Sequence, residues 1–188
     1  MDHIVITIAR SYGSGGRTLG KLLAKEMGIN CYDREILRMA SEQSGINEAL
    51  FGQVDEKIKT MPLFRISNNI YKGEIFPPDS DEFTSDDNLF NYQAKIIKEL
   101  AKTESCIIIG RCADFILKDE PDVVRLFFYA PREDCIKRVM SQKEKSSEKL
   151  KKQINIVPII IDTIQEKTGM TPEITISVSI RPAQVMIN

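Results

Sequence analysis

The chain has 188 residues, of which 42% are hydrophobic and 28% charged, and 26 basic residues nearly balance 27 acidic ones. These proportions are typical of a soluble globular protein, and the length suits a single domain over residues 1–188. A net charge near zero argues against binding to nucleic acid or a membrane through bulk charge, although it permits a local basic cleft. No hydrophobic run reaches the ~20 residues that span a bilayer, and Asp2 stands where a secretory signal would be basic, so we expect a cytoplasmic protein.

Histidine and cysteine are too sparse for several kinds of catalytic chemistry. His3 is the only histidine, and none of the four cysteines forms a C-x-x-C pair. We therefore expect neither a zinc site nor a Ser-His-Asp or Cys-His catalytic device, and we expect reduced, mostly buried thiols. The chemistry of this chain must rest on carboxylates, arginines, backbone groups and a metal ion if one is bound.

The first thirty residues predict a strand, a glycine-rich loop and a helix in succession. Residues 4–8 form a short hydrophobic run rich in β-branched side chains, which suits a strand buried on both faces of a parallel sheet. A turn follows, made of Gly13, Ser14, Gly15 and Gly16, and residues 18–27 have the hydrophobic spacing of a helix.

This loop has the properties of a phosphate-binding site. Glycines allow backbone N–H groups to curl around an anion, and the following helix N-terminus adds about half a unit of positive charge. Ser14 and Thr18 offer hydroxyl groups, and Thr18 could also ligate magnesium. Arg10 and Arg17 bracket the loop with permanent positive charge. The alternative is a tight turn that binds no ligand.

The loop departs from the standard P-loop spacing, G-x-x-x-x-G-K-[ST]. When Gly15 is aligned on the second glycine, Arg10 occupies the first glycine position and Gly16 occupies the lysine position. The charge that reaches the β- and γ-phosphates is therefore missing from its usual place. Arg17 is the nearest substitute, and we expect it to be catalytic, with the geometry of a planar fork in place of a flexible point charge.

Three stretches resemble the cytidylate kinase-like proteins, a bacterial branch related to the P-loop nucleoside monophosphate kinases. They are GSGGRTLGKLLAKEMG at 13–28, YDREIL at 32–37 and IIIGRCADFIL at 107–117, and the resemblance covers residues 4 to about 149. It implies a three-layer α/β fold with a parallel sheet flanked by helices, a phosphate-binding loop, an acceptor-binding insert and a mobile lid. It also implies ATP and Mg²⁺, and it leaves the acceptor unspecified.

A second group of candidates follows the strand expected at 29–32. Asp33 and Arg34 leave the carboxyl end of this strand, the edge where open α/β sheets bind ligands. Asp33 is also expected to cap a helix that runs to about Ser44, and both roles can hold together. The resemblance puts the YDRE segment near the transferred phosphate or the acceptor, so Asp33 is predicted to be catalytic and Arg34 to bind substrate.

The middle of the chain is less regular. A helix is expected over 45–59, and the proline-, glycine- and serine-rich stretch 60–87 follows it. By the resemblance, residues 60–87 are the acceptor-binding insert or flap; the alternative is a surface excursion without a ligand role. A helix is then expected through residue 102, with Leu89, Phe90 and Ile97 among its buried positions.

Arg111 is the strongest candidate after the loop. It follows Gly110 at the carboxyl end of the strand expected at 105–109, where a guanidinium can bind a phosphate with two hydrogen bonds. Asp114 either reads a base or ribose or caps the next turn. In the resemblance, Arg111 and Asp114 lie where cytidylate kinases bind the acceptor nucleotide, so Arg111 is predicted to be catalytic and to bind substrate, and Asp114 to bind substrate. The alternative for Arg111 is a structural ion pair.

A fourth strand is expected over 123–129, and Pro131 opens a helix that carries Arg132, Lys137 and Arg138. By the resemblance this basic stretch leads to a lid at 143–155. The alternative for this dense run of Lys, Glu and Ser is a solvated helix.

The tail at 156–188 departs from the family, starting at about Glu148. Read two bases later with suitable synonymous codons, residues 156–180 can spell STDNNRYYTGKNWNDPGNYDLCIN, which contains the TG-x-x-W and N-Y-D-L features of the family. We therefore hypothesise a frameshift, in the gene or in the sequence record, between about residues 143 and 151. As written, residues 173–180 alternate as a strand does and suit the last sheet position.

Two functions remain open at this stage. The first is ATP- and magnesium-dependent phosphoryl transfer to a nucleoside monophosphate, cytidylate-like, or to a similar small phosphorylated acceptor. Its donor phosphates would lie on Gly13 to Thr18, and its acceptor would contact Asp33, Arg34, Arg111 and Asp114. The alternative is a catalytically impaired nucleotide- or anion-binding protein of the same fold. A scaffold domain with a structural glycine loop is the weaker third interpretation, and no nucleic-acid or membrane partner is expected.

Overall fold

The computed structural model describes residues 3–60, 74–141, 176–180 and 183–187. The chain divides into two compact units, Met1–Cys31 with Glu104–Asn188, and Tyr32–Thr103. The prediction of a single domain stays a prediction. Within the described residues, no helix is long and hydrophobic enough to cross a membrane.

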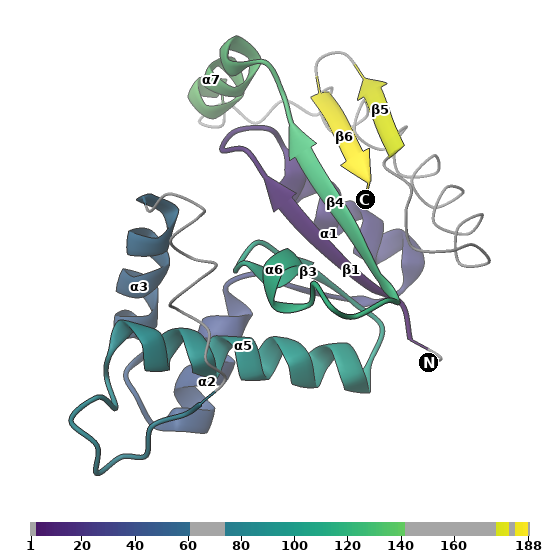
Figure 1. Cartoon of the computed structure of the whole chain (residues 1–188). Helices are drawn as coiled ribbons and strands as arrows, with labels where there is room; N and C mark the ends of the chain where they lie inside the picture. Colours follow the sequence, from purple (N-terminus) through teal and green to yellow (C-terminus); the bar gives the residue numbers. More distant parts are fainter. Residues whose placement is uncertain (1–2, 61–73, 142–175, 181–182, 188) are drawn as a thin grey trace. The chain divides into compact units, whose positions relative to one another are not determined.

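The first unit is built on a six-stranded sheet in the order β2-β3-β1-β4-β6-β5 (Figure 1). Its strands are β1 (Val5–Arg10), β2 (Asn30–Tyr32), β3 (Cys106–Ile109), β4 (Val123–Tyr129), β5 (Ile176–Ile180) and β6 (Ala183–Ile187). β1 lies at the centre and pairs in parallel with β3 and β4, with Ile6 opposite Ile107 and Val124. The expected α/β fold with a parallel sheet is confirmed.

The far edge of the sheet is antiparallel. β6 pairs with β4, with Leu126 opposite Ile187, and β5 pairs with β6. The strand expected within 173–180 therefore exists as β5, the last strand of the sheet, whereas sequence reasoning missed β6. The predicted lid at 143–155 and most of the tail lie outside the described residues.

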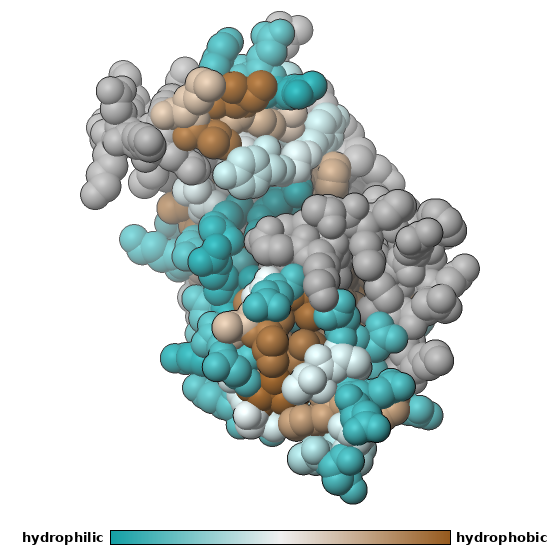
Figure 2. Space-filling model, turned by 90° about the vertical axis from the view of Figure 1, so that its left-hand side faces the viewer, coloured by the Kyte–Doolittle hydropathy of each residue, from teal (hydrophilic) through white to brown (hydrophobic). Residues whose placement is uncertain are grey.

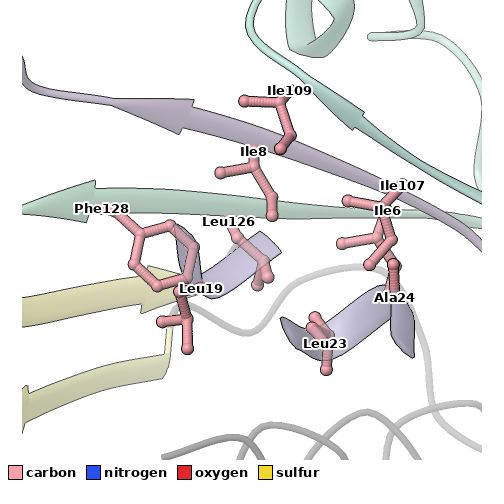
Figure 3. Packing of buried hydrophobic residues seen from close by; sticks show 9 residues of the cluster. All are labelled: Ile6, Ile8, Leu19, Leu23, Ala24, Ile107, Ile109, Leu126 and Phe128. Atoms are coloured by element: carbon pink, nitrogen blue, oxygen red, sulfur yellow. The ribbon is translucent and has the colours of Figure 1, made fainter. Parts of the chain in front are cut away.

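The core of this unit lies between α1 (Gly16–Met27) and the sheet. Figure 3 shows Leu19, Leu23 and Ala24 of α1 facing side chains of β1, β3 and β4, and all nine residues drawn are buried. α1 approaches the sheet closely at Gly20, where a Cβ would lie 2.8 Å from Cδ1 of Ile8 and 2.9 Å from Cδ1 of Ile109. Burial of each large aliphatic side chain contributes roughly 1.5–3 kcal/mol, so this packing fixes the start of α1 against the ends of the strands.

Among the described residues, the first unit also contains the short α6 (Ala113–Ile116) and α7 (Arg132–Ser141). α7 exposes the hydrophobic side chains of Ile136 and Met140, by 44% and 75%. Figure 2 shows a hydrophobic area at the top of the molecule, at the height where Figure 1 draws α7. This face of α7 is therefore not part of the core.

The described part of the second unit contains helices that pack on one another: α2 (Glu35–Ser44), α3 (Glu48–Thr60) and α5 (Asp86–Thr103). The positions expected to be buried on α5 are buried, among them Leu89, Phe90 and Ile97. The predicted helices match these elements to within about three residues at each end.

The predicted insert at 60–87 is described only at Thr60 and over residues 74–87. Its second part is attached to α5 by buried amides. The side chain of Asn88 accepts a hydrogen bond from the N–H of Phe76 at 2.8 Å and donates to the carbonyl of Phe83 at 2.7 Å. Asn91 donates to the carbonyl of Glu74 at 2.6 Å. This part of the insert is thus ordered by α5.

Candidate functional site

The glycine-rich loop connects the end of β1 to the start of α1. The N–H of Ser11 donates to the carbonyl of Phe128 on β4 at 2.9 Å, and the N–H of Ser14 donates to the carbonyl of Ser11 at 3.2 Å. Gly13 and Gly15 have φ values of 78° and 93°, which residues other than glycine rarely adopt. The glycines are therefore required by the path of the chain.

The start of α1 presents backbone donors next to this loop. α1 begins at Gly16, and its first intrahelical bond joins the N–H of Leu19 to the carbonyl of Gly15 at 3.0 Å. The N–H groups of Gly16, Arg17 and Thr18 precede that bond, and no side chain caps the helix at Gly15. Together with the helix dipole they create a positive end that suits an anion.

Ser14 provides the most specific signal in the loop. Its side chain is 3% exposed, and its Oγ has no hydrogen-bond partner among the described residues. A buried hydroxyl without a partner lowers the stability of the fold by about 1–3 kcal/mol. A bound ligand that accepts or donates a hydrogen bond at Ser14 is one explanation for its presence. Thr18, one turn into the helix, is half-buried.

Helix α7 packs directly on this loop. A Cβ at Gly13 would lie 2.8 Å from the carbonyl oxygen of Cys135 and 3.0 Å from Cγ2 of Val139. Arg138, expected to belong to a basic stretch leading to the lid, donates a hydrogen bond to the carbonyl oxygen of Gly13. Sequence reasoning missed this contact, since the two residues lie 125 positions apart.

Arg10 links the loop to the end of β3. A Cβ at Gly16 would lie 3.0 Å from the Cβ of Arg10, and a Cβ at Gly110 would overlap Nη1 of the same arginine. The side chain of Arg10 therefore starts beside the loop and carries its guanidinium to Gly110. Arg17, the expected substitute for the lysine, is exposed in the first turn of α1.

The segment after β3 is a left-handed turn. Gly110, Arg111 and Cys112 have φ values of 72°, 59° and 53°, and the last two are the only positive-φ residues other than glycine in the described part of the chain. The N–H of Ala113 closes the turn on the carbonyl of Gly110 at 3.0 Å. Such a conformation costs roughly 1–3 kcal/mol per residue and is found preferentially at functional sites. It presents the half-buried Arg111 directly after Gly110, beside which the guanidinium of Arg10 lies.

The other predicted acceptor residues are distributed over both units. Asp114 is exposed in the first turn of α6, where the N-cap position belongs to Cys112. Asp33 and Arg34 belong to the second unit: Asp33 is 5% exposed and Arg34 is exposed. The expectation that Asp33 caps α2 was wrong, because Arg34 occupies the N-cap position and the N–H of Asp33 donates to the carboxylate of Glu35 at 2.9 Å.

The described part of the chain offers few groups for thiol or metal chemistry. All four cysteines are free thiols, two of them buried and two half-buried. Burial, followed by the nearby Glu104 and Cys31, raises the pKa of Cys106 to about 12, so this thiol stays protonated. No group of three or more His, Cys, Asp or Glu side chains among these residues is arranged to hold a metal ion.

Comparison with models of known protein families identifies one family. A model described as the cytidylate kinase-like family matches residues 5–157, a range that includes every predicted site residue. Similar solved structures include an uncharacterized protein from Eubacterium ventriosum, with 22% identity and a TM-score of 0.46 over 92% of this chain and 82% of that one. They also include shikimate kinase from Acinetobacter baumannii in complex with shikimate, with 13% identity and a TM-score of 0.37 over 88% and 80%. No curated protein matches the chain.

Proposed function

The chain belongs to the cytidylate kinase-like family, and from this premise we propose that it is a cytoplasmic phosphotransferase that uses ATP and Mg²⁺. The acceptor is a nucleoside monophosphate, cytidylate-like, or a similar small phosphorylated compound. In the reaction an oxygen of the acceptor phosphate attacks the γ-phosphorus of ATP. The bond between the γ-phosphorus and the oxygen that bridges it to the β-phosphate breaks. The products are ADP and the phosphorylated acceptor, which is a diphosphate.

One observation carries this proposal: the buried Oγ of Ser14 has no partner among the described residues, and it lies in a glycine loop at the start of a helix. A loop that served only as a turn would have no use for this hydroxyl. Gly13 to Thr18 would hold the donor phosphates through backbone N–H groups, with Arg17 adding charge from the first turn of α1. Catalysis of this type consists of positioning and charge neutralisation, which suits a chain whose only histidine is His3.

Thr18 is the proposed protein ligand of magnesium. The described residues contain no cluster of carboxylates for a metal, so the ion would be held by the hydroxyl of Thr18 together with the phosphates of ATP. Bound there, it would neutralise charge on the β- and γ-phosphates.

The acceptor would be positioned by arginines and carboxylates. Arg111 is presented by the left-handed turn after β3, a conformation with a cost that a structural ion pair alone would not require. Asp114 lies in the next turn of chain, and both supply groups that recognise phosphate, ribose or base. Asp33 and Arg34 stay proposed acceptor residues.

A specific observation favours a second candidate, a nucleotide-binding protein that has lost turnover. Gly16 occupies the position of the P-loop lysine, and the tail from about Glu148 departs from the family. Loss of a positive charge at the transferred group typically lowers turnover by ~10³-fold or more, while binding through the loop would survive.

The test is coupled ATP turnover against the common nucleoside monophosphates and several small phosphorylated acceptors, with ATP affinity measured by calorimetry in parallel. Turnover with one acceptor establishes the kinase and identifies its substrate. ATP binding without turnover for any acceptor supports the second candidate. Absence of both would contradict the whole proposal and leave the loop as a structural turn.

A further inference from the structure

We propose that Arg10, at the end of β1, supplies the positive charge that a standard P-loop takes from its lysine. The inference rests on the proposed function and adds a residue to its catalytic site. Sequence spacing alone pointed to Arg17, whereas the packing around Gly16 points to Arg10.

This loop differs from the standard one at two positions. The standard loop has glycine at the position of Arg10 and lysine at the position of Gly16. This chain has the large cation and the glycine in exchanged places. The exchange keeps one cation and one glycine in the loop.

The structure gives a physical reason for the exchange. A Cβ at Gly16 would lie 3.0 Å from the Cβ of Arg10 and 3.1 Å from the Cβ of Phe128, closer than side chains normally pack. The Cβ of Arg10 thus occupies the space into which a lysine side chain at position 16 would extend. Glycine at position 10 would remove the contact with the Cβ of Arg10, whereas the Cβ and Cγ of Phe128, at 3.1 and 3.3 Å, would remain. The residues at positions 10 and 16 are therefore in contact, and a side chain at position 16 fits more easily when position 10 is glycine.

The location of the Arg10 guanidinium suits the role of the P-loop lysine. Arg10 is the last residue of β1, at the carboxyl edge of the parallel strands, and it is half-buried. Its side chain starts at the phosphate-binding loop, and its Nη1 reaches Gly110, the first residue of the turn that holds Arg111. A cation with this span lies between the proposed donor site and the proposed acceptor site. That is where charge develops during phosphoryl transfer, and partial burial keeps it poorly screened by solvent.

Arg17 differs from Arg10 in its exposure to solvent. It is exposed on the first turn of α1, so its charge is well screened. Its removal is expected to weaken ATP binding modestly, whereas removal of Arg10 should lower both kcat and the affinity for polyphosphate.

The experiment is a double-mutant cycle on Arg10 and Gly16. The full chain is prepared as Arg10→Gly, Gly16→Lys and the double variant, which restores the standard spacing. Arg10→Gln is added because it keeps part of the stem against Gly16 and removes only the charge. Lys21→Ala, an exposed lysine one turn further along α1, is the matched control for loss of a cation. Each variant is checked by thermal unfolding, and kcat, KM and affinity for inorganic tripolyphosphate are measured.

We expect Arg10→Gln and Arg10→Gly to lower kcat by ~10²–10³-fold and Lys21→Ala to leave it unchanged. Gly16→Lys alone should also lose activity, because its side chain collides with Arg10. The double variant should regain about tenfold or more over Arg10→Gly, since the cation returns to the site from the other position. Tripolyphosphate affinity should follow the same order, independently of turnover.

The inference is overturned if folded Arg10→Gln keeps the kcat and tripolyphosphate affinity of the unmodified chain, or if the double variant is no better than Arg10→Gly. These results leave the proposed function intact when the unmodified chain turns over ATP. Failure of the unmodified chain to bind either ATP or tripolyphosphate would instead overturn both.

Discussion

The guanidinium of Arg138 donates a hydrogen bond to the carbonyl oxygen of Gly13 and so attaches helix α7 to the phosphate-binding loop. The same helix brings the carbonyl oxygen of Cys135 to a position 2.8 Å from where a Cβ of Gly13 would lie. α7 precedes the region expected to form the lid. A change in the position of α7 would therefore act on the loop directly.

The first prediction concerns this contact. Gly13→Ala should destabilise the fold by about 2–5 kcal/mol, because φ is 78° and the methyl group meets backbone atoms of α7. The control is Gly28→Ala, where φ is 65° but nothing lies within 4 Å, so only the conformational cost of about 1–2 kcal/mol applies. Chemical denaturation measures both. Equal losses would contradict the close packing of α7 on the loop.

A second pair of glycine variants should change stability in opposite directions. Gly20→Ala should destabilise by about 1–3 kcal/mol, because its methyl group would lie 2.8 Å from Cδ1 of Ile8 in the core. Gly52→Ala, within α3 and with nothing inside 4 Å, should stabilise by roughly 0.5–1 kcal/mol through higher helix propensity. Thermal unfolding of the two variants gives the signs. A stable Gly20→Ala protein would mean that α1 lies farther from the sheet.

Ser14→Ala should separate stability from ligand binding. Removal of a buried hydroxyl without a protein partner should stabilise the ligand-free chain by about 1 kcal/mol, while ATP affinity falls by ~3–10-fold through one lost hydrogen bond. Thr7→Val is the matched control, because Oγ1 of Thr7 is also buried without a partner among the described residues but belongs to the central strand. It should give the stability gain alone. A loss of ATP affinity in Thr7→Val equal to that in Ser14→Ala would remove the evidence for a ligand at Ser14.

The reactivity of Cys106 should depend on unfolding. Because the pKa of this thiol is raised to about 12 in the folded state from 9.0, the thiolate is absent from the native protein at pH 9 but half-formed in the unfolded chain. Native protein should therefore react with a thiol reagent at this position only after denaturation, with Cys106→Val as the reference. The same shift makes the folded state lose stability as pH rises from about 9 towards 12. Rapid labelling of native Cys106 at pH 9 would contradict its burial.

The frameshift hypothesis has a direct test. The family match extends to residue 157, past about Glu148, the point from which we expect the written tail to depart from the family. Sequencing of the gene should reveal a shifted frame between about residues 143 and 151, and the protein with the shifted tail should turn over ATP faster than the chain as written. An intact mass and a gene sequence that both agree with the written tail would rule the frameshift out.

Hydrophobic periodicity was sufficient to predict most of the fold. The hydrophobic run at residues 4–8 belongs to the central strand, and the helical spacing at 18–27 belongs to the helix that covers it. A strand buried on both faces has a continuous hydrophobic run, whereas a helix buried on one side has hydrophobic residues at helical spacing, so the two patterns differ. The antiparallel β6 was not predicted, since five residues after Pro182 carry too little pattern to indicate a strand or its partner.

The candidate site was only partly accessible from sequence. The glycine loop was identified because backbone conformation there requires glycine. The left-handed turn was not, because arginine and cysteine have no preference for positive φ and only the surrounding structure imposes it. The pair Arg10 and Gly16 left a signal, the exchange of cation and glycine, but its meaning depends on a contact between their Cβ positions that spacing cannot reveal.

The most direct test of the central claim is ³¹P NMR of the full chain incubated with MgATP and each nucleoside monophosphate, CMP first. We predict that γ-phosphate signal is replaced by equal amounts of ADP and one new nucleoside diphosphate, with no matching release of inorganic phosphate. ATP that stays intact, or that yields only ADP and inorganic phosphate with every acceptor, would contradict phosphoryl transfer as the function of this chain.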